Sequence, residues 1–313
     1  MNSPCHRPVA TQCTTVAGRG LQAGLTLIEL MISITLGMLV VAAAISLMLS
    51  TKSSYTIEDD TTRLLDTGRY AIESVTRAVR LAAFENLISV SDDAVPIVKA
   101  STDAPNIQGY SAQTFAADAG SGLPARNPGP SDILQIRFFG TPDGTTINCA
   151  GVTTAPTPTP AQSDDGRGWS IFYVREVAGG EPELRCAYLD STSRFVSNPI
   201  ASGIESFRVL YGIDLDGDGV PDRFASAADL PAIAPAPATP FSTVVAVKIS
   251  ILARGTRVQR TDAENVVYEL FGPSYPGAQI PESTLLKSRT RKVFSTVIQL
   301  RNRPEGGNIK PLP

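Results

Sequence analysis

The sequence predicts an α+β protein, in which one long N-terminal helix packs on an antiparallel β-sheet. An uncharged apolar run, Leu30–Leu49, is followed by an amphipathic helical pattern that contains no proline before Pro96. After about residue 88, short runs rich in β-branched and aromatic residues alternate with turn residues. The first pattern predicts the helix and the second predicts the sheet.

The apolar run is long enough to cross a membrane. As a helix it spans roughly 30 Å, which is the thickness of a bilayer core. Between Arg19 and Lys52 the only charged residue is Glu29. Arg7 and Arg19 precede the run, and positive charge favours a cytoplasmic N-terminus. The sequence therefore predicts a single-pass segment with the rest of the chain on the far side.

Glu29 separates three interpretations of this run. A secretory signal peptide has a shorter apolar core, with a small-residue cleavage site after it. A simple signal anchor allows the length but gives no reason for an acid at the edge of the membrane. Because an intramembrane acid is costly and usually functional, Glu29 favours a helix with a further role.

The amphipathic continuation carries a stripe of small and apolar residues. They recur at three- and four-residue steps: Leu65, Gly68, Ile72, Val75, Val79 and Ala82. Most of the nearby arginines fall off this stripe. We expect it to pack against the sheet as part of the same helix.

The region after residue 88 contains six predicted strands. They are Ile133–Phe139, Trp169–Val177, Leu184–Leu189, Ile204–Ile213, Val244–Ala253 and Lys292–Leu300. Several alternate apolar and polar residues, as in an antiparallel sheet with one buried face. Two proline-rich stretches, Thr153–Pro160 and Pro231–Pro240, are expected to be loops.

Composition argues against several functional classes. The chain has 313 residues and a net charge of −3, so it lacks the basic footprint of a nucleic-acid-binding protein. The only histidine is His6. If the segment before the apolar helix, residues 1–24, is removed, 289 residues remain, with a charge of −5 and no histidine. Such a chain has no histidine-based triad or zinc site, and no P-loop or nucleophile elbow is visible, so we expect no enzymatic activity.

Two cysteines remain after such a removal, Cys149 and Cys186. On the oxidising side of a bacterial membrane a disulfide is the expected state. Two thiols without histidine make a poor zinc site, and no C-x-x-C motif is present for redox chemistry.

Asp214–Asp222 reads DLDGDGVPD and resembles the first part of a calcium-binding loop. The predicted ligands are the side chains of Asp214, Asp216, Asp218 and Asp222 and the backbone carbonyl of Val220. Ala225, the twelfth residue counted from Asp214, stands where such loops carry a bidentate glutamate. The run before the loop is a predicted strand, whereas a helix precedes such loops in paired calcium-binding motifs. A solvated Asp/Gly turn is the alternative.

The segment Ala23–Ile32, AGLTLIELMI, resembles the processing signal of the type IV pilin family. The resemblance implies that prepilin peptidase cuts after Gly24 and that Leu25 becomes the methylated N-terminus. Glu29 is then the fifth residue and pairs with the N-terminal amine of a neighbouring subunit. Leu25 stands where the family usually has phenylalanine.

The resemblance divides the chain into three parts. It implies a leader at residues 1–24, a transmembrane and stalk helix at 25–88, and an exported β-rich head at 89–313, in a type IV pilin-like fold. Within the head, Phe207–Phe224 and Arg291–Arg303 resemble the PilW-type minor pilins.

This resemblance implies a structural subunit that primes type IV pilus assembly near the pilus tip. Its partners would be prepilin peptidase, other minor pilins, the major pilin and a tip adhesin. The protein would sit in the inner membrane with a periplasmic head and then reach the pilus on the cell surface. The alternatives are a type II secretion pseudopilin and a ligand-binding adhesive minor pilin.

Overall fold

The computed structural model describes residues 24–84, 106–116, 122–154, 167–176, 180–233, 240–258, 266–273, 275, 278–281 and 289–302. Its contacts divide the chain into two units, Met1–Tyr55 and Thr56–Pro313. The predicted leader lies outside the described residues except for Gly24, and so does most of each proline-rich stretch.

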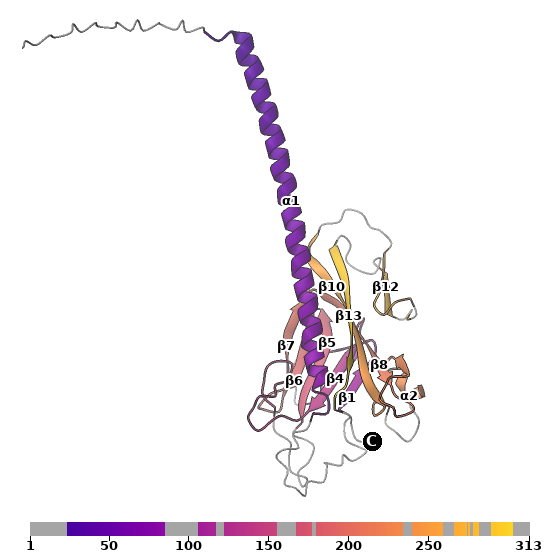
Figure 1. Cartoon of the computed structure of the whole chain (residues 1–313). Coiled ribbons are helices and arrows are strands. Elements are labelled where there is room, and N and C mark those ends of the chain that lie inside the picture. The colour runs from indigo at the N-terminus through magenta and orange to yellow at the C-terminus, as the bar shows by residue number, and fades with distance from the viewer. Residues whose placement is uncertain are drawn as a thin grey trace, which may run out of the picture. The chain divides into compact units, whose positions relative to one another are not determined.

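Helix α1 (Leu27–Arg80) contains residues of both units (Figure 1). In the first unit every described residue, from Gly24 to Tyr55, is exposed. By length and composition α1 could cross a membrane, as the apolar run predicts. The helix ends at Arg80, before the predicted residue 88, because Ala83 adopts a left-handed backbone conformation with φ 59°.

In the second unit, α1 buries one face against the sheets. The buried residues are Asp60, Leu64, Gly68, Ala71, Val75, Ala78 and Val79. The predicted stripe is confirmed at Gly68, Val75, Val79 and Ala82, which are buried, and at Ile72, which is partly buried and packs against the core. Leu64 is buried in place of Leu65, and Ala71 is buried as well. Gly68 is needed for close approach, because a Cβ atom there would overlap the ring of Phe294.

Two antiparallel sheets form the body of the second unit. The five-stranded sheet has the order β1-β4-β5-β6-β7. Its strands are β1 (Ile107–Tyr110), β4 (Ile133–Phe138), β5 (Gly168–Glu176), β6 (Pro182–Leu189) and β7 (Phe195–Ser202). The four-stranded sheet has the order β13-β10-β8-β9. Its strands are β13 (Arg289–Gln299), β10 (Val244–Val258), β8 (Ile204–Ile213) and β9 (Arg223–Ala225).

The remaining described elements are short. Two hairpin-like pairs join β2 (Gln113–Phe115) to β3 (Arg126–Pro128) and β11 (Val267–Glu269) to β12 (Gln279–Pro281). A single helical turn, α2, spans Leu230–Ile233.

One core joins α1 to both sheets. Val75 from α1, Phe172 from β5 and Ile249 from β10 belong to the same buried cluster. The sheets are tied together at Asp132, whose backbone N–H donates to the carbonyl of Phe207 at 2.8 Å. Its carboxylate accepts from the Val209 N–H and from the Arg208 guanidinium, each at 2.9 Å. The C-terminal half of α1 therefore lies on a head built from two sheets (Figure 1).

Candidate functional site

The predicted processing residues lie at the N-terminal end of α1. Gly24, Leu25 and Thr26 precede the helix, and Glu29 lies in its first turn. The Thr26 hydroxyl accepts from the Glu29 backbone N–H at 3.4 Å, which is the threonine half of a capping box. Among the described residues, the Glu29 carboxylate has no ion-pair partner. It is therefore free to accept a cation from another chain.

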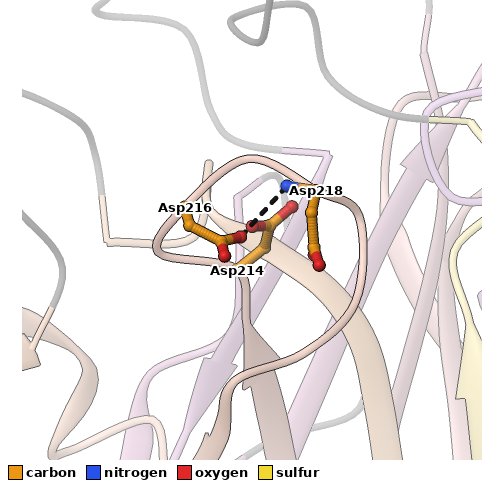
Figure 2. A group of neighbouring side chains, drawn as sticks. All are labelled: Asp214, Asp216 and Asp218. Carbon is orange, nitrogen blue, oxygen red and sulfur yellow. Dashed lines mark hydrogen bonds between the residues drawn. The ribbon is translucent and has the colours of Figure 1, made fainter.

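The acidic loop gathers its first three aspartates, as predicted. Ligand atoms of Asp214, Asp216 and Asp218 lie within 4.8 Å of one another (Figure 2). The loop can close this tightly because Gly217 and Gly219 have φ angles of 83° and 88°. The three carboxylates come together on consecutive turns of one short segment.

Backbone N–H groups hold these carboxylates in place. Asp214 accepts from Gly217 at 2.6 Å and from Gly219 at 2.8 Å. Asp216 accepts from the N–H of Asp218, and Asp218 accepts from the N–H of Val220. Each acid therefore stabilises the turn that follows it, whether or not a cation is bound.

The remaining predicted ligands fit less completely. Asp222 is outside the three-residue cluster, and its Oδ2 accepts from the Leu215 N–H at 2.7 Å. Ala225 at position 12 has no carboxylate to offer, and it is buried in β9. The donor set is all oxygen, which suits calcium, but it contains three gathered carboxylates instead of a full cage.

The disulfide is confirmed. Cys149 and Cys186 are bonded, with Cα atoms 6.0 Å apart, and the bridge ties the loop after β4 to strand β6. The Cys149 backbone N–H also donates to the Ser170 hydroxyl at 3.0 Å. This loop is therefore fixed to two strands of the five-stranded sheet.

A largely buried ion network, which the sequence did not predict, joins β8, β10 and β13 to Glu181, the residue before β6. Arg254 contacts Glu181 at 2.6 Å and Glu205 at 2.9 Å. Arg291 also contacts Glu205, at 2.6 Å, and Arg289 contacts Glu181 at 3.0 Å. The partners lie far apart in the sequence, so no local motif reveals them. Their mutual pairing indicates a structural role.

Two family models match this chain, one over part of the head and one over its N-terminal segment. The family model described as type IV pilus-assembly protein W matches residues 171–302. The prokaryotic N-terminal methylation motif matches residues 19–45, which include Gly24, Leu25 and Glu29.

Among solved structures, the chain is similar to the type IV-like pilin TTHA1219 from Thermus thermophilus. The two are 16% identical, with a TM-score of 0.36, over 77% of this chain and 98% of that chain. The comparison with curated protein sequences found no match.

Proposed function

Because the chain is a PilW-type member of the type IV pilin family, we propose that it is a minor pilin that primes pilus assembly near the tip. The observation that carries this proposal is the N-terminal half of α1. From Leu30 to Leu49 it is exposed, uncharged and mostly apolar, and its one acid, Glu29, lies five residues after Gly24. Such a helix suits transfer from a lipid bilayer into a bundle of similar helices.

The same helix supports a processing step. Prepilin peptidase would cut between Gly24 and Leu25, and the new N-terminal amine would be methylated. The cut falls outside α1, which begins at Leu27, so the scissile bond is not held in helical hydrogen bonds. In the assembled filament, the Glu29 carboxylate of one subunit would pair with the amine of the next. An acid in an apolar layer is stabilised by such a partner.

This role implies the location and partners of the protein. Before assembly α1 would span the inner membrane, with the N-terminus in the cytoplasm and the head in the periplasm. The assembled form would contact other minor pilins, the major pilin and a tip adhesin. Family membership points to a structural subunit, and we propose no catalytic activity for the head.

Piliation tests the main proposal. Surface pili would be counted in a strain lacking the gene, complemented with the wild-type gene, with Glu29→Val, or with empty vector. We expect few pili without the gene, recovery with the wild type, and full cleavage but poor recovery with Glu29→Val. Normal piliation of the deletion strain would contradict priming. A simultaneous loss of type II secretion would instead favour the pseudopilin role, and unchanged pili with lost attachment would favour an adhesive one.

We also propose that the acidic loop binds calcium. Asp214, Asp216 and Asp218 would hold the ion through their side chains, and Val220 through its carbonyl, with Asp222 contributing directly or through water. A bound cation would neutralise three gathered carboxylates and order the loop.

Calcium binding is tested by the melting temperature of the processed protein in detergent. We expect calcium to raise it and EGTA to reverse the rise, because a ligand that binds the folded state stabilises it. The Asp216→Asn, Asp218→Asn double variant should lose the response, and Asp190→Asn, which changes a half-buried acid in another turn, should keep it. A wild-type melting temperature indifferent to both reagents would rule the site out.

A further inference from the structure

The head contains a groove of about 320 Å³ that the functions above do not use. Three segments line it: the C-terminal part of α1, the loop of residues 147–151 that carries Cys149, and residues 198–200 of β7. All three belong to the second unit. The groove is thus a feature of the folded head, formed by residues far apart in the sequence.

The wall formed by residues 147–151 is rigid. The disulfide to Cys186 holds its centre. The side-chain oxygen of Asn148 accepts from the backbone N–H groups of Ala150, at 2.9 Å, and Val152, at 3.0 Å. Gly151 closes the turn with a φ of 80°. A wall fixed before binding reduces the ordering cost of an interaction.

The opposite wall offers unused binding groups. Tyr70, Ser74 and Arg77 follow one another at i, i+4 and i+7 along α1 and therefore share a face. Tyr70 is 57% exposed, and Arg77 is exposed and has no ion-pair partner within the described ranges. Arg77 is the one charged residue that lines the groove, so the described lining is cationic.

This combination of residues favours a protein partner. Tyrosine and arginine are enriched at the centres of protein interfaces, whereas lysine and acidic residues are depleted there. The groove also carries apolar surface from Leu81, Ile147 and Ile200. A partner segment that complements both the charge of Arg77 and this apolar surface has an acidic side chain beside an apolar one.

Addition of a strand to β7 does not fit this groove. Pro199 has no backbone N–H, and the pairing of β7 with β6 shifts register at this point, as in a β-bulge. Both features block continuous backbone pairing with a further strand. The partner would therefore be recognised through its side chains.

We propose that the groove receives an exposed segment of a neighbouring subunit of the pilin class, in which aspartate or glutamate stands beside an apolar residue. The partner carboxylate pairs with Arg77, and its apolar neighbour packs between Tyr70 and Ile200. This inference rests on the proposed function, because it names the chemistry by which the head would meet other subunits.

Photo-crosslinking in cells tests the inference on the full chain. Benzoylphenylalanine replaces Tyr70 in the groove or, as a matched control, Val297, which is 55% exposed on β13. We expect a cross-link from position 70 to another pilin-class subunit, and mass spectrometry of the joined peptide should find aspartate or glutamate beside an apolar residue. A yield at position 70 no higher than at position 297, or a joined peptide without an acid, would overturn the proposal.

Charge changes provide a second criterion. Arg77→Glu should lower the cross-link yield at least tenfold, and Arg77→Lys should retain most of it. Ala150→Glu places an acid on the opposite wall and should also abolish the cross-link. Unchanged yields in both glutamate variants would refute the role of Arg77.

Processing and disulfide formation, followed on gels, show whether each variant is folded. The two proposals can fail separately. If the cross-link meets these criteria but the strain forms normal pili without the gene, the groove is supported and the priming function is refuted.

Discussion

At the scale of single residues, Tyr211 in β8 shows how burial shifts a pKa. Its side chain is 1% exposed, and its hydroxyl has no hydrogen-bond partner among the described residues. Burial raises the pKa of Tyr211 well above its usual value, and the negative charge of Asp132 adds to the increase. The folded state therefore holds the phenolic proton more tightly than the unfolded chain does.

This shift predicts alkaline instability. Because the folded pKa is raised, its contribution to stability is complete below pH ~10 and is lost as the pH rises above that value. Tyr211→Phe removes the titrating group without breaking a described hydrogen bond. We expect unchanged or slightly higher stability at pH 7 and an unfolding midpoint shifted to higher pH, measured by circular dichroism in a pH titration. An identical alkaline midpoint in both proteins would contradict this account.

At the scale of elements, the second half of α1 is stabilised by a narrow buried face. Val75 is fully buried in the common core, whereas Arg69, less than two turns away, is exposed. Val75→Ala should lower the free energy of unfolding by about 2 kcal/mol, because it removes buried methyl groups and leaves a cavity. The control Arg69→Ala should change it by less than about 0.5 kcal/mol. Urea denaturation of the processed protein measures both, and equal effects would argue against this packing.

The elements also show what the sequence could predict. Strand β8 matches its predicted bounds, Ile204–Ile213, because its apolar residues are dense and flanked by turns. Strand β7 was missed because Asn198 and Pro199 interrupt the pattern, and the edge of a sheet tolerates such residues. Strands of three or four residues, such as β1 and β9, are too short to show a period.

The residues of the candidate sites also divide into those that the sequence predicts and those that it does not. The three aspartates of the acidic loop and the two cysteines were predictable, because the aspartates alternate within five residues and the cysteines are the one pair left when residues 1–24 are removed. The groove between Tyr70, Ala150 and Ile200 was not, because it exists only after three distant segments are packed together. The shift of the buried face from Leu65 to Leu64 likewise depends on how the sheets meet α1.

At the scale of the whole molecule, the disulfide links a long loop to the five-stranded sheet. Its cysteines are separated by 37 positions in the sequence. Closing such a loop stabilises the folded state by about 4 kcal/mol in the chain-entropy model. The Cys149→Ser, Cys186→Ser variant should therefore melt at a lower temperature than the wild type. Dithiothreitol should lower the melting temperature of the wild type alone, and equal sensitivity of the two proteins would contradict the prediction.

The exposed apolar surface of α1 restricts how the helix can move from one environment to another. From Leu27 to Leu49 the helix presents leucine, isoleucine, valine and methionine side chains that the rest of the described chain leaves uncovered. Contact of this surface with water is unfavourable in proportion to its area. Departure from one apolar environment must therefore coincide with arrival in the next. Any transfer of this helix between two apolar environments would therefore avoid water only where the two environments are in contact.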